Sequence, residues 1–245
     1  LLLLPLTLPN PDLIQDVRRF VSQSRLDGVI LPAPMGDFTS IQRLLTDLEI
    51  PFARIAPRMP LAEGLSIHCN DEQASYEVTQ FLIDQGHQRL GFIKGDPIHA
   101  ATAHRFEGYL RALKANEIEY HGEYVQDGQF SFESGKSATR AMLDLRAPPS
   151  AIIASNDDMA AGTIFEARER GLRIPEDLSV VGFDDTPIAS RIWPPLTTVR
   201  QPIVEMAEAV TGLLIQKLRG ETVDLSERSF ACHVVTRAST GPSYQ

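Results

Sequence analysis

The chain has 245 residues, with 23 Lys and Arg against 32 Asp and Glu, which gives a formal net charge of −9 at pH 7. Hydrophobic residues make up 43% of the chain, enough for a packed core, so a disordered or fibrous protein is excluded. The sequence has no run of Lys and Arg that could neutralise the phosphates of a nucleic acid. Any DNA would therefore have to be bound by another segment.

The two cysteines, Cys69 and Cys232, lie far apart in the sequence. They are too few for a disulfide scaffold and lack the paired spacing of a zinc site, so we expect free thiols in a reducing cytosol. No apolar run approaches the roughly 18 residues that a membrane helix needs. The apolar opening segment lacks a basic region and is interrupted by Pro5 and Pro9, so we expect a buried strand there and not a signal peptide.

The first part of the chain alternates short apolar runs with longer segments of helical spacing. Val17, Phe20 and Val21, for example, lie three and four residues apart and would share one helix face. Gly86 is placed to end the third helix of this part. Strands are predicted over residues 1–6, 28–32, 52–55 and 65–68, and helices over residues 12–24, 39–48 and 71–85.

The same alternation starts again after Gly86. Strands are predicted over residues 89–94, 123–126, 151–155 and 178–183, and helices over residues 103–115, 133–145 and 159–170. Strands that are apolar throughout and flanked by helices indicate parallel sheets covered on both faces. Two successive series of strands and helices therefore predict an α/β protein with two doubly wound lobes.

The C-terminal part departs from this alternation. An extended piece is predicted over residues 197–202 and a last strand over residues 229–236. Between them, residues 204–218 carry apolar side chains at spacings of three and four, which predicts a helix with a wide apolar stripe.

Polar side chains follow two apolar strands of the second series. Asn156 lies in a Ser-Asn-Asp-Asp run after the strand 151–155, and Asp184 begins an Asp-Asp-Thr run after the strand 178–183. Ligands of open α/β sheets bind outside the carboxyl ends of the strands, which favours a binding site here. Asn156 is also placed to cap the helix that begins near residue 159, and this structural alternative stays open.

Arg105 follows the loop after the strand 89–94. Its planar guanidinium can bond two adjacent oxygens of a hydroxylated ligand, although a salt bridge on a helix surface would also explain an arginine there. His99 and His104 lie in the same region, but they are separated by a loop and have no fixed carboxylate partner. We therefore predict no metal site.

The sequence lacks the signatures of common enzymes. It has no GxSxG, no GxxxxGK[ST] phosphate loop, no HExxH, and no GxGxxG after the first strand. No cofactor is therefore expected, and nothing in the sequence activates a nucleophile. Binding is favoured over catalysis, and the chain is predicted not to be an enzyme.

Collinear motifs along nearly the whole chain resemble the effector-binding core of the lactose/galactose-repressor family of bacterial transcription regulators. Two long motifs carry most of this resemblance, SAIIASNDDMAAG at residues 150–162 and GLRIPEDLSVVGFDDTPIASRIWPPLTTVRQP at residues 171–202. Shorter matching segments are RLDGVILPAP at residues 25–34, GHQRLGFIKG at 86–95, RFEGYLRAL at 105–113 and VVTRAST at 234–240.

The resemblance implies a fold like that of periplasmic binding proteins, in which three crossovers join two lobes. The crossovers are expected near residues 87, 199–201 and 227. The expected first lobe comprises residues 1–87 and 200–226, and the second comprises residues 88–199 and 227–245. The helix 204–218 would then pack on the first lobe, and the strand 229–236 would return to the second. The family's helix-turn-helix DNA-binding domain and the first strand-helix unit of the first lobe are expected to be missing from this chain.

The resemblance also implies which residues bind the effector. Arg105, Asn156 and Asp184 match positions at which the family hydrogen-bonds its ligand. Carboxylate, amide and guanidinium groups suit the hydroxyls of a sugar, and Phe130 would offer an aromatic face to its C–H side. His99 occupies a variable specificity position.

Two further residues are candidates for the same site. Asn70 begins an Asn-Asp pair that replaces the usual Asp-Asn order at the edge of the cleft. Trp193 is a second aromatic platform, with packing under Pro194 and Pro195 as the alternative.

The function implied is that of the effector-binding and dimerisation module of a cytoplasmic transcriptional repressor that senses a sugar or small glycoside. The full-length protein would bind operator DNA as a homodimer through its N-terminal domain, without a membrane. A purine effector stays open because Phe130 would stack a base as well as a sugar. Two other functions also stay open, a periplasmic sugar-binding protein for transport and a Rossmann-like enzyme with Asp184 or His99 as acid or base.

Overall fold

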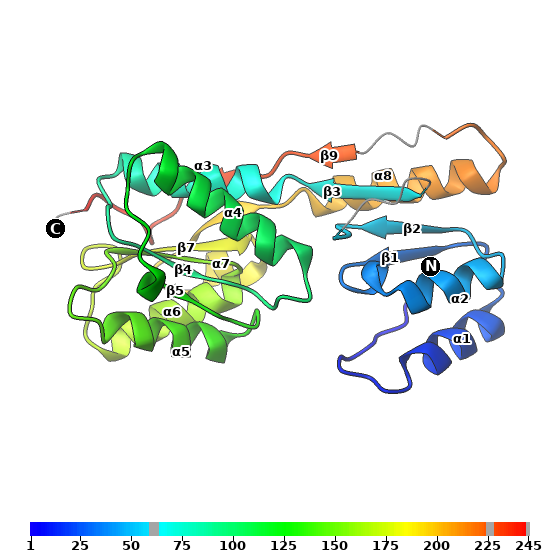
Figure 1. Cartoon of the computed structure of the whole chain (residues 1–245), viewed down its shortest axis with the longest axis horizontal. Coiled ribbons are helices and arrows are strands. Elements are labelled where there is room, and N and C mark those ends of the chain that lie inside the picture. Colours follow the sequence, from blue (N-terminus) through cyan, green and yellow to red (C-terminus); the bar gives the residue numbers. More distant parts are fainter. Residues whose placement is uncertain (59–63, 224–227, 244–245) are drawn as a thin grey trace. The chain divides into compact units, whose positions relative to one another are not determined.

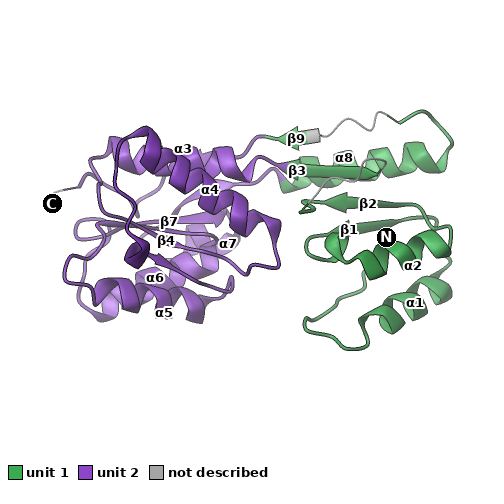
Figure 2. Cartoon of the chain, in the orientation of Figure 1, with its two compact units in different colours: residues 1–68, 203–230 green, residues 69–202, 231–245 purple. Residues whose placement is uncertain are grey.

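The computed structural model describes residues 1–58, 64–223 and 228–243. Its contacts divide the chain into two compact units, which Figure 2 colours separately. The first unit consists of residues 1–68 and 203–230, and the second of residues 69–202 and 231–245. The chain therefore passes between the units three times.

The first unit combines one sheet with three α-helices and a short 3-10 turn. Its elements are α1 (Leu13–Ser24), β1 (Val29–Pro32), η1 (Met35–Asp37), α2 (Thr39–Asp47), β2 (Phe52–Ile55), β3 (Leu65–Cys69), α8 (Ile203–Leu218) and β9 (Arg228–Phe230). The last residue of β3, Cys69, already belongs to the second unit. The strand order is β1-β2-β3-β9, and β1, β2 and β3 run parallel. Figure 1 shows α1 and α2 on one side of this sheet and α8 on the other.

The apolar stripes of these helices make the core of the first unit. Val17 and Val21 of α1 pack with Leu31 of β1 and with Leu44 and Leu45 of α2. α8 contacts β2, so the predicted tail helix does pack on the first sheet. The helical spacing read from the sequence therefore selected the correct buried faces.

The prediction of a buried strand over residues 1–6 is wrong. These residues form neither strand nor helix, and the side chains of Leu1, Leu2 and Leu3 are exposed. β1 is the outer strand of its sheet. Because Pro5 has no N–H to donate, the segment is poorly suited to extend that edge, and Leu4 instead packs partly buried against the core.

The second unit is larger and is built on a six-stranded sheet. Its helices are α3 (Asp71–Asp84), α4 (Ala100–Ala115), α5 (Phe132–Leu143), α6 (Asp157–Glu169) and α7 (Pro187–Arg191), with a 3-10 turn η2 (Gly122–Tyr124). Its strands are β4 (Leu90–Ile93), β5 (Val125–Gln126), β6 (Ala151–Ala154), β7 (Ser179–Asp184), β8 (Thr197–Arg200) and β10 (His233–Val235).

These strands follow the order β10-β8-β7-β6-β4-β5, and all pairs are parallel except the antiparallel pair of β10 with β8. Every residue of β4 and β6 is buried. Figure 1 shows why, because α3 and α4 cover one face of the sheet and α5 and α6 cover the other. The predicted fold class, α/β with two lobes of mainly parallel sheet and three crossovers, is confirmed.

The C-terminal segment changes sheets where a single strand was predicted. The prediction of one strand over residues 229–236 is wrong, because β9 joins the first sheet and β10 joins the second. Ala231 and Cys232 lie between the two strands. The first passage between the units falls after His68, while the predicted lobe boundary lies at residue 87, so α3 belongs to the second compact unit. The predicted domain ranges remain a prediction.

Among the described residues, no helix is both long enough and apolar enough to cross a bilayer.

Candidate functional site

Arg105 of α4 is the centre of a buried polar cluster in the second unit. Its side chain is almost fully buried, and Nε donates a hydrogen bond of 2.7 Å to Oδ1 of Asp71. Nη1 donates to the backbone carbonyl of Ser155, and Nη2 lies 3.6 Å from Oδ1 of Asp184. The guanidinium carbon lies 3.6 Å from the centre of the Phe183 ring, which supports its face. Arg105 thus joins helix α3, strand β6 and the end of strand β7.

Close packing of α3 on α4 holds Arg105 against Asp71. Gly108 lies one turn after Arg105, and a Cβ atom there would be 2.1 Å from the carbonyl oxygen of Glu72. Ser75 of α3 donates through Oγ to the backbone carbonyl of Arg105. A glycine at position 108 is therefore required for the helix spacing that lets Arg105 reach Asp71.

Asp184 is the second carboxylate of this cluster. Its side chain is half-buried, and Oδ1 accepts a hydrogen bond of 2.5 Å from Nε2 of Gln201. Burial raises the pKa of Asp184 to about 6, although Arg105 and Gln201 act in the opposite direction. Asp184 has a φ of 105°, which few residues other than glycine adopt.

The charge of Arg105 is held by its partners. Burial alone would lower the pKa of its guanidinium, but Asp71 and Asp184 more than offset that effect and the pKa is raised. We call Arg105, Asp71, Asp184 and Gln201 the polar cluster. It offers acceptor oxygens beside a fixed cation, an arrangement suited to the hydroxyls of an uncharged ligand.

Asp185, the next residue, has a different role. Arg200 and Arg237 each donate to its carboxylate at 2.6 Å. Burial acts to raise the pKa of Asp185, but the bonds from Arg237 and Arg200 hold it below its ordinary value. We call Asp185, Arg200 and Arg237 the arginine brace, because these bonds tie the turn after β7 to β8 and to the C-terminal segment.

Asp157 is also committed to structure. Its carboxylate accepts hydrogen bonds from the backbone and hydroxyl of Thr186 and from the hydroxyl of Thr198. Burial nevertheless raises the pKa of Asp157. Of the four aspartates at the carboxyl ends of β6 and β7, Asp184 alone belongs to the polar cluster.

Asn156 caps helix α6, as the structural alternative predicts, and whether it also binds effector stays a prediction. Its Oδ1 accepts a 2.9 Å hydrogen bond from the backbone N–H of Met159. Its Nδ2 donates at 3.1 Å to the backbone carbonyl of Phe130, which has a φ of 55°. The same amide therefore begins a helix and holds the loop that carries the predicted aromatic residue.

His99 and Phe130 lie together in the loops that follow β4 and β5. Their rings meet edge to face with centroids 5.3 Å apart. The Phe130 ring occupies the space that a side chain at Gly95 would need, since a Cβ atom there would lie 1.9 Å from Cζ of the ring. The structure therefore brings these two candidates into contact.

The other two candidates lie outside this arrangement. Asn70 is exposed and caps α3 by accepting from the backbone N–H of Gln73, whereas the following residue, Asp71, reaches Arg105. The side chain of Trp193 is 73% exposed, so it is not packed under Pro194 and Pro195. Among the described contacts none joins Trp193 to the polar cluster. Whether either residue binds effector stays a prediction.

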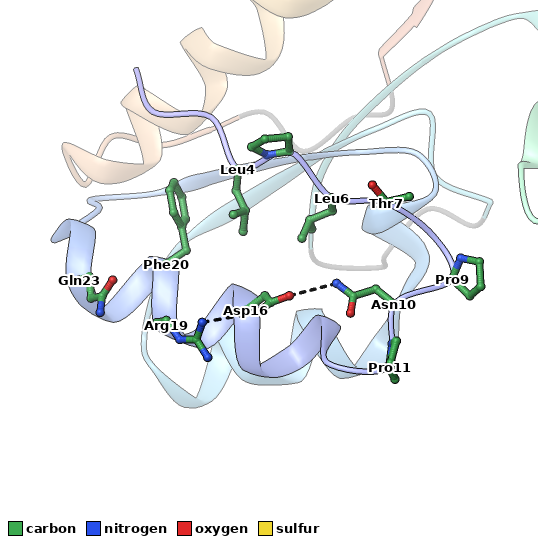
Figure 3. Close-up of a pocket in the computed structure, with 11 residues that line it drawn as sticks. Leu4, Leu6, Thr7, Pro9, Asn10, Pro11, Asp16, Arg19, Phe20 and Gln23 are labelled. Atoms are coloured by element: carbon green, nitrogen blue, oxygen red, sulfur yellow. Dashed lines mark hydrogen bonds and ion pairs between the residues drawn. The ribbon is translucent and has the colours of Figure 1, made fainter.

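A separate hollow of about 480 Å³ lies in the first unit. The extended segment from Leu4 to Pro11 and the helix α1 line it (Figure 3). Asp16 in this hollow accepts from Asn10 and lies 3.9 Å from Arg19. None of the predicted site residues lines this hollow, and within the described part of the chain no three acidic, histidine or cysteine side chains are grouped as metal ligands.

Three residues of the site were not predicted from the sequence. Asp71 and Gln201 bind Arg105 and Asp184, and Cys69 donates to Gln201. The inverted Asn-Asp pair was a usable signal for Asp71. Gln201 lies within the recognised motif, but nothing in its local pattern indicates that its side chain reaches a residue 17 positions earlier.

Most of the chain is similar in sequence to proteins that are already known. The sequence pattern of the family described as "Periplasmic binding protein-like domain" matches residues 79–240. The HTH-type transcriptional repressor CytR of Escherichia coli (strain K12) is 34% identical over 223 residues, which cover 88% of this chain and 63% of CytR. The chain therefore spans less than two thirds of the length of that relative.

Solved structures of regulators have the same fold. A complex of the transcriptional regulator CelR with cellobiose matches with a TM-score of 0.84 and 28% identity, covering 94% of this chain and 71% of that chain. A regulatory protein of the LacI family from Chloroflexus aggregans matches with a TM-score of 0.85 and 28% identity, covering 97% of this chain and 85% of that chain. The predicted resemblance to this group of regulators is confirmed, and these relatives are named as regulators and not as enzymes.

Proposed function

Because the chain belongs to the family of periplasmic-binding-protein-like domains, we propose that it is the effector-binding and dimerisation module of a bacterial transcriptional repressor. The proposed effector is a sugar or a small glycoside. In the complete regulator, operator DNA would be bound by a helix-turn-helix domain and two copies would act as a homodimer in the cytoplasm. The names of the relatives support this proposal over transport or catalysis.

The polar cluster is the observation that carries the proposed chemistry. The charge of Arg105 is already balanced by two carboxylates, through a hydrogen bond to Asp71 and an ion pair with Asp184, which disfavours a phosphate at this site. Asp184 has acceptor capacity left after its bond to Gln201, since a carboxylate accepts several hydrogen bonds. Such a site favours an uncharged hydroxylated molecule, and the Phe130 ring with His99 at its edge supplies a surface for a sugar ring.

We propose that the effector changes the DNA affinity of the regulator by selecting one of two conformations. Moving such an equilibrium from 1:99 to 99:1 requires a difference in binding free energy of about 5.5 kcal/mol. Asp184 and Arg105 are the proposed sources of much of that difference, because bonds to charged groups are stronger than those between neutral groups.

Thermal denaturation in the presence of candidate ligands tests this function. The panel contains cellobiose, monosaccharides, a sugar phosphate and nucleosides. A specific ligand at 100 times its Kd stabilises by about 2.7 kcal/mol, which for a chain of this size raises Tm by roughly 5–10 °C. We expect a neutral sugar to do so and the sugar phosphate not to. If only nucleosides stabilise the chain, the effector contains a base and the proposed sugar is wrong. If no member of the panel stabilises the chain, the proposal is contradicted.

Asp184→Asn identifies the site, with Asp158→Asn as its matched control. Asp158 lies in the acidic run after β6 and is exposed. Because Asp184→Asn removes a charged acceptor, its affinity for the sugar that stabilises the parent should be about 10- to 100-fold lower in isothermal titration. The Asp158→Asn control should bind that sugar as tightly as the parent does. Equal affinity of Asp184→Asn and the parent would contradict the assignment of the site.

A further inference from the structure

Gln201 connects the polar cluster to a buried cysteine. The amide of Gln201, in the segment after β8, donates through Nε2 to Oδ1 of Asp184 and accepts through Oε1 a 3.2 Å hydrogen bond from the thiol of Cys69. Cys69 is the last residue of β3 and is buried. One hydrogen-bonded chain thus runs from the end of β3, through the segment after β8, to the carboxylate at the end of β7.

Asp184 and Cys69 together hold the Gln201 amide. The two ends of an amide differ, because the nitrogen only donates and the oxygen only accepts. An ionised carboxylate has no proton to donate, so Asp184 must face the nitrogen of Gln201, which leaves the amide oxygen facing Cys69. The S–H of Cys69 then supplies the donor that this oxygen needs and fixes the far end of the amide.

Asp71 is a second acceptor for the same thiol. Its Oδ2 lies 3.6 Å from Sγ of Cys69, farther than Oε1 of Gln201 at 3.2 Å. The Asp71 carboxylate also receives Nε of Arg105 at Oδ1. Cys69 therefore contacts the polar cluster at two residues, at Asp71, which binds Arg105, and at Gln201, which binds Asp184.

We propose that Cys69 is a positioning residue of the effector site, which acts through Gln201 to hold the Asp184 carboxylate in its binding orientation. The proposal rests on the proposed function, in which Asp184 binds effector. Cys69 itself need not touch the ligand. Its contribution is to keep a neutral donor on Asp184.

The charges that face Asp184 determine what loss of this donor would do. Arg105 on α4 favours the charged carboxylate, whereas Asp71 on α3 and Asp157 on α6 disfavour it. With burial already raising the pKa of Asp184 to about 6, loss of the Gln201 bond raises it further. In a larger fraction of the molecules, Asp184 would then be protonated at neutral pH, and the site would lose its charged acceptor.

The test titrates Asp184 by 13C NMR of its carboxyl in the unliganded chain. Cys69→Ala should bind the proton at Asp184 about 3- to 10-fold more tightly than the parent, the equivalent of one lost hydrogen bond. Cys69→Ser keeps a donor of similar size and should titrate as the parent does. Cys232→Ala removes the other buried thiol, which is a hydrogen-bond neighbour of Cys69. It leaves the bond from Cys69 to Gln201 in place, so the Asp184 titration should stay within twofold of the parent.

Gln201→Met covers the case in which Cys69→Ala does not fold. It keeps the length of the side chain and removes its hydrogen bonds, so it should raise the proton affinity of Asp184 at least as much. An Asp184 titration unchanged in Cys69→Ala, or changed equally in Cys69→Ser, would overturn the positioning role.

Cellobiose titration at pH 7 separates this proposal from the proposed function. If the parent binds cellobiose, Cys69→Ala should bind it about 3- to 10-fold more weakly and Cys69→Ser within twofold. If the parent binds neither cellobiose nor any other sugar while the Asp184 titration still shifts, the proposed function fails and the link from Cys69 to Asp184 stands. If the parent binds sugar and the variants bind equally, the positioning role fails and the function stands.

Discussion

Asp184 and Asp185 are consecutive residues, but they belong to two regions that treat a carboxylate differently. In the polar cluster, burial raises the pKa of Asp184 to about 6, and Arg105, which Asp184 shares with Asp71, offsets only part of that rise. In the arginine brace, Asp185 has Arg200 and Arg237 to itself, and its pKa falls. A carboxylate with two cations of its own stabilises the fold, whereas one that shares a cation keeps acceptor capacity for a ligand.

The largest effect is expected from removing the shared cation. Arg105→Met leaves the buried Asp71 carboxylate without its partner, and breaking a buried pair from one side costs about 3–5 kcal/mol. The free energy of unfolding in urea at pH 7 measures this loss. Arg111→Met on the same helix removes an exposed pair with Glu72 and should cost less than about 1 kcal/mol. Similar losses in both variants would remove the distinction between a buried and an exposed pair.

Removing the brace should cost less. Asp185→Asn weakens the bonds from Arg237 and from Arg200, and because Arg200 is mostly exposed we expect a loss of about 1–2 kcal/mol at pH 7. Since the pKa of Asp185 is lowered by folding, its carboxylate stabilises the parent above the unfolded pKa. Parent and variant should therefore converge as pH falls below about 4, the ordinary pKa of Asp. A constant difference down to pH 2 would contradict this account.

Asp184→Asn should change the free energy of unfolding in the opposite direction and stabilise the chain. Folding raises the pKa of Asp184 to about 6, so the folded chain holds this proton more tightly and the parent loses stability as pH rises from about 4 to about 6. The variant lacks this loss and should be about 1–2 kcal/mol more stable than the parent at pH 7. Urea unfolding across this pH range measures it. A variant less stable than the parent at pH 7 would mean that Asp184 stabilises the fold as Asp185 does.

The smallest expected effect is the difference in stability loss between variants of the two asparagine caps, Asn156 and Asn70. Asn156→Ala removes the cap of α6 and the bond to the Phe130 carbonyl, while Asn70→Ala removes only the cap of α3. Each cap is worth about 1 kcal/mol, and the extra bond of Asn156 adds about another 1 kcal/mol. Asn156→Ser keeps a cap and should recover roughly half of the loss. Thermal denaturation distinguishes these values, and equal losses for the two Ala variants would show that the Phe130 loop is held by other contacts.

Part of the site could be predicted because it lies at strand ends. Asn156 and Asp184 lie at the carboxyl ends of two buried, mainly apolar strands, and the carboxyl ends of neighbouring parallel strands meet at one edge of a sheet. Arg105 was recognisable from its motif. Asp71 and Cys69 were not assigned, because their partners are 34 residues away at Arg105 and 132 residues away at Gln201.

The sequence by itself determined the α/β class, the succession of helices and strands, and the absence of the usual enzyme motifs, because apolar periodicity and local motifs are properties of short segments. Only the tertiary structure decided that Asp184 faces a shared arginine while Asp185 binds two arginines of its own. The physical reason is that a carboxylate's role depends on the charges and donors around it. Those are brought together by packing between segments that are distant in the chain.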